Sequence, residues 1–186
     1  MTTRCSWANN DLLYEKYHDE EWGVPLHDEH GLFEMITLEG AQAGLSWITV
    51  LRKRENYRRA FAAFDPKKVA RFDKSKIDEL MLDEGVIRHR GKLESTVSNA
   101  NLFLGVQKSE GSFDKFIWRF VGGTPLSGEG TIRATSSESD AMSKALKKLG
   151  FKFVGSTICY AFMQACGMVN DHQKQCFKFS EHSEQR

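Results

Sequence analysis

The apolar positions between Leu32 and Trp47 follow the repeat of an α-helix, and one residue breaks the pattern. Leu32, Ile36 and Ala43 fall on one narrow face of this helix, which is predicted to end near Ala43. Glu39 lies in the middle of that face. An ionised carboxylate removed from water costs on the order of several kcal/mol unless it is paired or protonated. The pattern therefore marks Glu39 as a residue that needs an explanation.

Two interpretations of Glu39 remain open from the periodicity. A glutamate at the boundary of the core can extend to solvent or pair with a nearby arginine, which is the ordinary structural arrangement. Alternatively, the carboxylate faces a pocket for a polar or cationic ligand, with Trp47 close enough to stack on that ligand. The periodicity alone favours neither interpretation.

The remaining pattern is helical along most of the chain. Asp11 is predicted to cap a short helix whose Tyr14, Tyr17 and His18 share one face. Pro66 is predicted to open another helix, because proline is tolerated at the first helical position. Further helices are predicted at 47–64, 74–82, 91–106, 112–121, 139–149 and 157–168. Residues 122–135 are predicted to form a surface loop or a very short hairpin, and no alternating strand pattern competes, so the predicted class is all-α.

The composition is that of an ordinary globular protein. The 186 residues are 40% apolar and 27% charged, which is enough to build one core, so we expect a single domain spanning 1–186. No apolar run approaches the roughly 18 residues of a membrane span, and the N-terminus MTTRCSW has no signal core. We therefore expect a cytoplasmic protein without a membrane partner. The net charge of +1 neither indicates nor excludes nucleic acid, although basic residues cluster at 52–59, 88–92 and 144–152.

Four residues near the two ends of the chain have the chemistry of metal ligands. His172 and Cys176 are four residues apart, which would place both side chains on one face of a helix. Cys5 and His18 can supply the second pair of a closed Cys2His2 zinc site that joins the two ends. Alternatively, Cys5 is a surface thiol and His172 is an ordinary residue at a helix end. Because the chain has no C-x-x-C motif, the spacing leaves both interpretations open.

The turn from Gly150 to Gly155 separates two predicted helices, the first of them rich in lysine. A tight turn before a helix N-terminus exposes backbone N–H groups that bind phosphate. With Lys152 beside these groups, the turn is predicted to contact a DNA backbone without recognising individual bases. The alternative is a plain connection between helices whose apolar residues fill the core, and the turn taken alone favours that connection.

Large aromatic residues gather in the N-terminal third of the sequence: Trp7, Tyr14, Tyr17, Trp22 and Trp47. Around a buried carboxylate, such rings suit a planar, positively charged ligand, which they bind by stacking and by cation–π contact. An aromatic core without a ligand is the structural alternative.

Taken together, these segments resemble the DNA-3-methyladenine glycosylase I family, a branch of the helix-hairpin-helix DNA glycosylases. The resemblance covers nearly the whole chain. It rests on YHDEEWGVP at 17–25, LEGAQAGLSWITVLRKRENY at 38–57, HRGK at 89–92, SKALKKLGFKFVGSTICYAFMQACG at 143–167 and NDHQKQC at 170–176. Several long and chemically unusual strings in one order are far more specific than a single motif. Residues 124–135 and the polar tail from 177 are the least similar parts.

The resemblance implies an all-α, two-lobe helix-hairpin-helix fold with a pocket in the cleft between the lobes and a zinc clasp joining the terminal segments. The helix-hairpin-helix would span about 139–168, and a tail at about 177–186 is expected to be flexible. The implied activity is hydrolysis of the N-glycosidic bond of 3-methyladenine in double-stranded DNA, which releases the free base and leaves an abasic site. A monomer is expected.

The resemblance also assigns roles to individual residues. Glu39 is expected to contact the extruded base and Trp47 to stack on it, while Leu45 would fill the gap left in the duplex. Tyr14 and Tyr17 would complete the pocket. The remaining expected roles are pocket walls at Trp7 and Trp22, DNA backbone contacts at Lys152, Phe153, Val154 and Gly155, and one structural zinc ion on Cys5, His18, His172 and Cys176.

Two positions depart from most helix-hairpin-helix glycosylases. Phe153 stands where many have the first glycine of the hairpin, and their catalytic aspartate has no clear counterpart. Asp171 is the nearest candidate, and we interpret it as a partner of a metal ligand. Because no lysine near the hairpin is placed to form a Schiff base, we expect no lyase step. The alternative hypotheses are a non-enzymatic DNA-binding module and a zinc hydrolase, which would need an open metal position.

Overall fold

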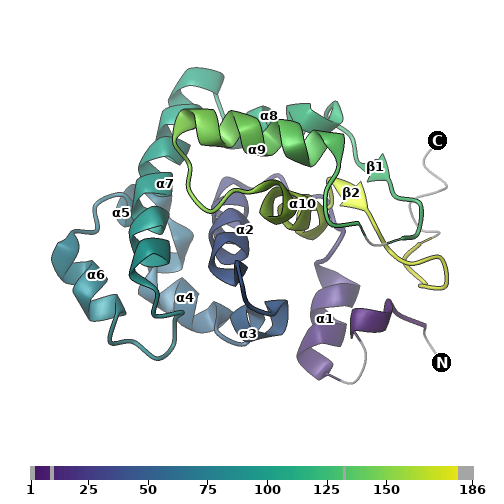
Figure 1. Cartoon of the computed structure of the whole chain (residues 1–186), viewed down its shortest axis with the longest axis horizontal. Helices are drawn as coiled ribbons and strands as arrows, with labels where there is room; N and C mark the ends of the chain where they lie inside the picture. Colours follow the sequence, from purple (N-terminus) through teal and green to yellow (C-terminus); the bar gives the residue numbers. More distant parts are fainter. Residues whose placement is uncertain (1–2, 9–10, 132, 180–186) are drawn as a thin grey trace.

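The computed structural model describes residues 3–8, 11–131 and 133–179, and these residues form a mainly helical protein (Figure 1). The α-helices are α1 (Leu12–Glu20), α2 (Glu29–Gln42), α3 (Trp47–Leu51), α4 (Arg54–Ala60), α5 (Pro66–Val69), α6 (Lys74–Leu80), α7 (Arg90–Glu110), α8 (Phe113–Trp118), α9 (Ser137–Leu149) and α10 (Ser156–Ala165). Short 3-10 turns are η1 (Ser6–Ala8), η2 (Ala62–Phe64) and η3 (Arg119–Val121), and two short strands are β1 (Leu126–Ser127) and β2 (Val169–Asn170). The all-α prediction is confirmed. Most of the tail predicted to be flexible, 180–186, lies outside the described residues.

The helix α2 lies at the centre of the fold, with other helices packed around it (Figure 1). Asp28 caps its first turn by accepting a hydrogen bond from the N–H of Gly31 at 2.7 Å, and the helix ends at Gln42, as predicted. Every residue from 32 to 41 is buried, although the sequence pattern indicated only one narrow buried face. A helix enclosed on all sides must also bury its polar residues, and these therefore need partners inside the protein.

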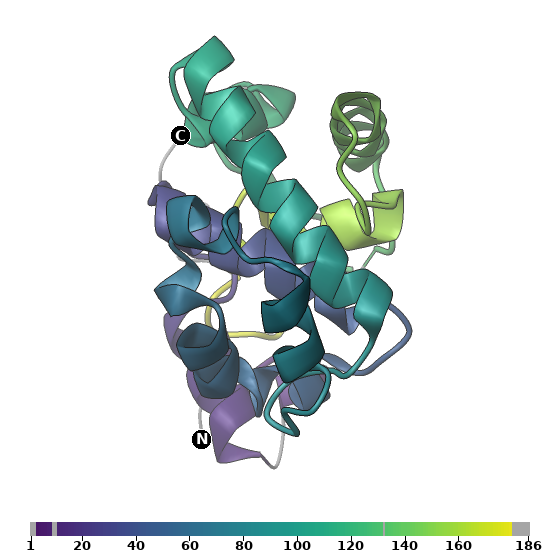
Figure 2. The same ribbon diagram turned by 90° about the vertical axis from the view of Figure 1, so that its left-hand side faces the viewer.

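The helix α7 is the longest in the described part of the chain and runs along the side of the molecule that faces the viewer in Figure 2. His89 caps its start by accepting a hydrogen bond from the N–H of Lys92 at 3.1 Å. The helix packs on α2, α5, α6 and α8. It extends to Glu110, further than the predicted 91–106, and stops at Gly111, whose φ is +89°.

The prediction of one long helix at 47–64 is wrong. The segment is divided into α3, α4 and η2. Residues 62–64 have φ angles between +51° and +55°, in the left-handed region that no α-helix of L-residues can continue through. The periodicity concealed this break because Tyr57 and Phe61, which precede it, and Phe64 within it are all buried in the core.

The prediction that His172 and Cys176 share a helical face is also wrong. The chain after β2 forms turns and no helix as far as residue 179. β2 pairs in parallel with β1, Leu126 opposite Val169, so the loop at 122–135 does not form the hairpin considered from the sequence. Parallel strands require a long connection, which here includes α9 and α10. The pairing fixes this terminal segment against the rest of the fold.

The helices α9 and α10 pack together across the tight turn at 150–155. Ser136 and Ser139 form a capping box at the start of α9, and Gly150 ends the helix with a φ of +99°. Phe153 adopts a φ of +56°, which is strained for a residue with a side chain. Position 153, where many helix-hairpin-helix glycosylases have glycine, is therefore left-handed in this chain although it holds phenylalanine. No helix among the described residues is long and apolar enough to cross a membrane.

Candidate functional site

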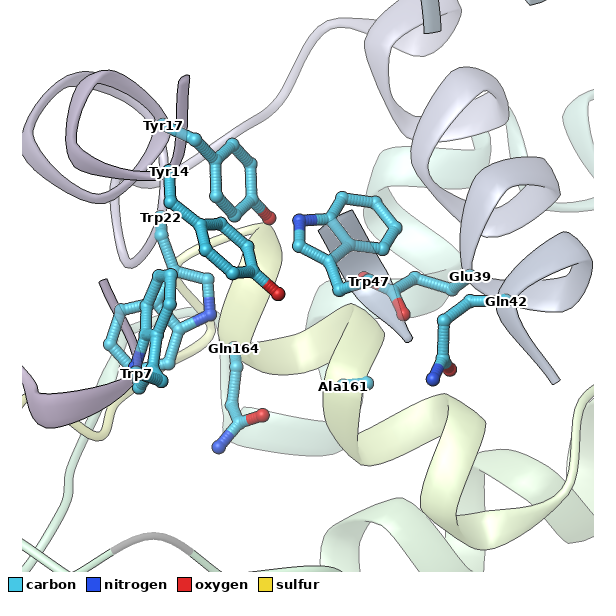
Figure 3. A pocket seen from close by; sticks show the side chains of 9 residues that line it. All are labelled: Trp7, Tyr14, Tyr17, Trp22, Glu39, Gln42, Trp47, Ala161 and Gln164. Atoms are coloured by element: carbon cyan, nitrogen blue, oxygen red, sulfur yellow. The ribbon is translucent and has the colours of Figure 1, made fainter. Parts of the chain in front are cut away.

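A cavity of about 290 Å³ opens between α1, α2, α3 and α10 (Figure 3). Its walls include all the aromatic residues predicted to gather there, namely Trp7, Tyr14, Tyr17, Trp22 and Trp47. The lining is completed by Glu39 and Gln42 from α2 and by Ala161 and Gln164 from α10. The fold thus brings the aromatic residues and the unusual carboxylate to one place.

The rings around this cavity pack on one another mainly through their edges. The ring centroids of Trp7 and Tyr14 are 5.3 Å apart with planes at 74°, and those of Trp7 and Trp22 are 5.0 Å apart at 73°. The rings of Tyr17 and Trp47 lie 5.4 Å apart, tilted by 45°. An edge-to-face pair uses the edge of one ring and one face of the other, which leaves the remaining ring faces for a flat ligand to stack against.

Glu39 is the carboxylate of the cavity wall, and it is only 4% exposed. Its side chain makes no hydrogen bond or ion pair with any other described residue. Burial raises the pKa of Glu39 to about 8, which favours the protonated carboxyl at neutral pH. A ligand that brings positive charge would favour the ionised form.

Glu34, earlier on the same helix, illustrates the structural alternative. Its Oε1 accepts hydrogen bonds from Nε of Arg54 at 2.5 Å and Nε of Arg58 at 3.0 Å. This is the arginine-paired arrangement that the sequence also allowed for Glu39. Since Glu39 has no such partner in the part of the chain that the structure describes, its environment is that of a ligand site.

A second polar group in the cavity wall also lacks a partner. Nε1 of Trp47 is buried without a hydrogen bond to any described residue, and Figure 3 shows it directed toward the hydroxyl end of Tyr17. The pKa of Tyr17 is raised well above its usual value, first by burial and then by the nearby Glu39. Tyr14 differs, because its hydroxyl accepts a hydrogen bond from the N–H of Ile48 at 3.1 Å. Buried polar groups without partners are rare, so those in this wall indicate a ligand.

Three lining residues were not predicted: Gln42, Ala161 and Gln164. Gln42 follows Glu39 by three positions, and Gln164 follows Ala161 by three, so helical spacing is the signal that could have identified them. Their side chains carry no unusual chemistry, and so they did not attract attention in the sequence.

Asp171 supports the wall of this cavity. Its Oδ2 accepts a hydrogen bond from Nε2 of Gln164 at 2.9 Å and another from the hydroxyl of Tyr160 at 2.5 Å. Because a carboxylate can only accept, the amide nitrogen of Gln164 must face Asp171. These contacts orient a pocket residue, which differs from the metal-supporting role that the sequence suggested for Asp171.

Leu45 lies in the turn between α2 and α3 and is 39% exposed. The turn passes through Gly44, whose φ is +79°, and Ser46 is the N-cap residue of α3. Nε2 of Gln42 donates to the carbonyl of Leu45 at 2.5 Å. An exposed apolar side chain therefore lies between two residues of the cavity wall, Gln42 and Trp47.

The four residues predicted to contact DNA differ in exposure. Lys152 is exposed, Phe153 and Gly155 are half-buried, and Val154 is only 1% exposed. Val154 can therefore offer only its backbone to a ligand. Its side chain fills the core, so the two interpretations of this turn do not exclude each other.

Cys5, His18, His172 and Cys176 form a buried group whose ligand atoms all lie within 4.8 Å of one another. Sγ of Cys5 is 3.6 Å from Nδ1 of His172, and Sγ of Cys176 is 3.4 Å from Nε2 of His18. A tetrahedral zinc ion with bonds of about 2.0–2.3 Å places neighbouring ligand atoms about 3.4–3.8 Å apart. The four side chains thus fit a metal ion.

Neighbouring residues orient the ring of His18 and set its charge. Its Nδ1 is 2.8 Å from Oδ1 of Asp19, which in turn accepts hydrogen bonds from the guanidinium of Arg4. Burial lowers the pKa of His18, which favours the neutral form that binds metals. Metal-binding histidines commonly direct their second nitrogen to a carboxylate in this way.

Comparison with known proteins agrees with this geometry. The sequence matches the family model described as methyladenine glycosylase over residues 7–179. DNA-3-methyladenine glycosylase 1 of Escherichia coli (strain K12) is 55% identical over 177 residues, which cover 93% of this chain and 95% of that protein. A crystal structure of 3-methyladenine DNA glycosylase I has 53% identity and a TM-score of 0.92, and the match covers 94% of this chain and 98% of that one. A variant of 3-methyladenine DNA glycosylase I solved in complex with 3-methyladenine has 38% identity and a TM-score of 0.89, with 93% and 95% of the two chains covered.

Proposed function

Because the chain belongs to the methyladenine glycosylase family, we propose that it is a base-excision repair enzyme acting on alkylated DNA. It hydrolyses the N-glycosidic bond of 3-methyladenine in double-stranded DNA, releases the free base and leaves an abasic site. The observation that carries the proposal is Glu39, a buried carboxylate without a partner among the described residues in a cavity walled by aromatic rings.

The charge of the damaged base explains why Glu39 lies in an apolar cavity. Methylation at N3 gives the adenine of DNA a positive charge, which an ionised Glu39 can stabilise while accepting hydrogen bonds from the exocyclic amine and the ring edge. A neutral adenine would leave the carboxyl protonated or uncompensated. Trp47 and the tyrosines supply stacking, which every purine can use. We therefore assign discrimination to Glu39 and general affinity to the rings.

The same charge supports a reaction without a strong general acid. A cationic base is a good leaving group because it departs as a neutral molecule once the glycosidic bond breaks. It also pairs weakly, so the cost of extruding it from the duplex is low. The pocket then has to bind the extruded base and hold it while water attacks the sugar.

Two exposed elements of the protein contact the DNA duplex in this proposal. We propose that Leu45 enters the gap left by the extruded base, because it is an exposed apolar side chain in the turn between two residues of the cavity wall, Gln42 and Trp47. The turn at 152–155 and the N-terminus of α10 bind the DNA backbone, through N–H groups and Lys152. We assign residues 139–168, which contain this turn and α10, as the helix-hairpin-helix of this enzyme.

We propose that the enzyme has no lyase step. Such a step needs an amine that can attack C1′ of the sugar. None of the residues that line the described cavity is a lysine. Lys92 is buried and engaged with carbonyl oxygens, and Lys152 lies on the backbone-binding turn. Incubation with borohydride should therefore trap no protein–DNA adduct.

We further propose that Cys5, His18, His172 and Cys176 hold one zinc ion. Bound there, zinc would supply a structural cross-link between the two ends of the chain, and it would take no part in the reaction because all four ligands come from the protein. One domain, a monomeric state and a cytoplasmic location complete the proposal. The four buried free cysteines and a DNA substrate support a reducing compartment.

Release of free base from methylated duplex DNA tests the function directly. The wild-type protein should release 3-methyladenine and leave intact strands with abasic sites. Glu39→Gln should reduce the excision rate at least tenfold, because the amide cannot compensate the positive charge. A protein that binds the duplex but releases no base would be a DNA-binding module. Wild-type excision by the Glu39→Gln variant would refute the role of Glu39.

A further inference from the structure

Lys92 is a buried cation near the start of α7 that neither the cavity nor the metal group uses. It is 8% exposed, and its Nζ donates to the carbonyl oxygens of Ala41 at 2.8 Å and Ala43 at 2.6 Å. No carboxylate among the described residues pairs with it. Lysine is rarely buried without a carboxylate partner, because its charge costs free energy away from water. The role of these two hydrogen bonds to carbonyl groups therefore needs an explanation.

The two carbonyls belong to the C-terminal end of α2. The last carbonyl groups of a helix have no partner within the helix, and together they carry a partial negative charge. A cation at this end satisfies the oxygens and stabilises the dipole. Lys92 therefore caps α2 from a neighbouring helix, close to the point where the chain enters the next turn.

The turn that follows is held by polar contacts and little else. Lys92 binds the carbonyls of residues 41 and 43, and Gln42 binds the carbonyl of Leu45. A methyl group added at Gly44 would meet no atom within 4 Å, so no packing surrounds this part of the turn. Leu45 and Ser46 are exposed. The conformation of the turn therefore depends on its capped start.

We propose that Lys92 is a positioning residue that fixes this turn so that Leu45 projects at a set distance from the cavity. The inference rests on the proposed function, because it concerns how a base leaves the duplex. Without Lys92 the turn at 43–46 loses its anchor, and Leu45 loses its fixed position. Extrusion of the damaged base from a duplex then becomes slower, whereas free 3-methyladenine still binds in the cavity.

Lys92→Met tests this proposal, since methionine keeps much of the length and removes the charge and the donors. Single-turnover excision of 3-methyladenine from duplex DNA should fall at least tenfold. Binding of free 3-methyladenine, followed by quenching of tryptophan fluorescence, should stay within twofold of the wild-type affinity. Lys108→Met, at an exposed position on the same helix, is the matched control and should change neither value.

A double-mutant cycle with Leu45→Ala separates positioning from general damage. If Lys92 acts through Leu45, Leu45→Ala should cost less than twofold in the Lys92→Met background, although it costs much more in the wild type. Multiplicative losses, unchanged duplex excision, or a parallel loss of free-base affinity would each overturn the inference. If Lys92→Met does not fold, Lys92→Gln, which keeps one donor, takes its place under the same criteria. A wild-type protein that releases no base would instead refute the proposed function, before any variant is compared.

Discussion

The side chain of Asn99 holds the backbone of Lys152 at two points. Nδ2 of Asn99 donates to the carbonyl of Lys152 at 3.0 Å, and Oδ1 accepts from its N–H at 2.9 Å. Asn99 lies on α7, seven residues after Lys92, so the two side chains share a face about 10 Å apart along the helix axis. One helix therefore connects to both elements that we propose to meet DNA.

Asn99→Ala should weaken binding to undamaged duplex DNA. Without the two hydrogen bonds the turn at 150–155 loses its fixed orientation, and we expect the Kd to rise about tenfold, or about 1.4 kcal/mol. Affinity for free 3-methyladenine should not change, because Asn99 does not line the cavity. Fluorescence anisotropy at fixed salt measures the first quantity. Asn101→Ala, at an exposed position on the same helix, is the control, and equal Kd values for the two variants would contradict the prediction.

Glu39→Gln should change how stability depends on pH. The folded-state pKa of about 8 lies above the ordinary 4.5 of an unfolded chain, so the folded protein binds an additional proton between these values. The stability due to this proton is fully present below about pH 4.5 and is lost as pH rises toward 8. The free energy of unfolding should fall by at most about 1.4 kcal/mol per pH unit in that window, and glutamine at position 39 removes this dependence.

Urea unfolding of both proteins at pH 6.0, 7.0 and 8.0 measures this effect as a difference. Contributions from other titrating groups are common to both proteins and cancel. The Glu39→Gln variant should gain stability relative to the wild type at each step upward in pH. Parallel curves would mean that Glu39 titrates near its ordinary value, and the account of its buried carboxyl would then be incorrect.

Cys176→Ser should remove the bound metal and destabilise the fold. The wild-type protein is expected to contain one zinc ion per chain, because its four candidate ligands are all buried and close together. Loss of a ligand also frees the N- and C-terminal segments from each other, so Tm should fall by at least 10 °C. Elemental analysis and thermal unfolding measure the two effects. Cys159→Ser, another buried cysteine outside the group, should keep the metal. A variant that loses activity with unchanged Tm would indicate catalytic zinc.

Local sequence signals predicted the start of several helices correctly. Asp11 caps the helix that was expected to follow it, and Pro66 is the first residue of its helix, as predicted. Periodicity failed at 47–64, where three left-handed residues end a helix without glycine or proline, and at α2, where a fully enclosed helix resembles an amphipathic one. Both failures have the same cause. Long-range packing decided the local structure, and a pattern of neighbours along the chain does not contain that information.

Some residues of the cavity wall could likewise be predicted from the sequence, and others could not. Its aromatic residues and Glu39 could be predicted because a charge on an apolar face is visible in the sequence. Gln42 and Gln164 were missed although helical spacing was available as a signal, since an amide side chain is equally common on a protein surface. The partners of Lys92 and Asn99 were beyond prediction for another reason, because each side chain binds backbone groups about fifty residues away. Backbone oxygen atoms carry no sequence signature.

Trp47→Phe separates stacking from hydrogen bonding in the cavity. Leaving Nε1 buried without a partner costs about 1–3 kcal/mol, and a bound base can offer an acceptor to it. Phenylalanine keeps an aromatic face and removes this donor, so the relief should offset the smaller ring and the free energy of unfolding should change by less than about 1 kcal/mol. Affinity for free 3-methyladenine should nevertheless fall about tenfold.

Tyr57→Phe is the control, because it removes a hydroxyl that accepts a hydrogen bond from Ile87 outside the cavity. This variant should show the reverse, with lower stability and unchanged affinity. Unaltered affinity of the Trp47→Phe variant would mean that the indole serves by stacking alone.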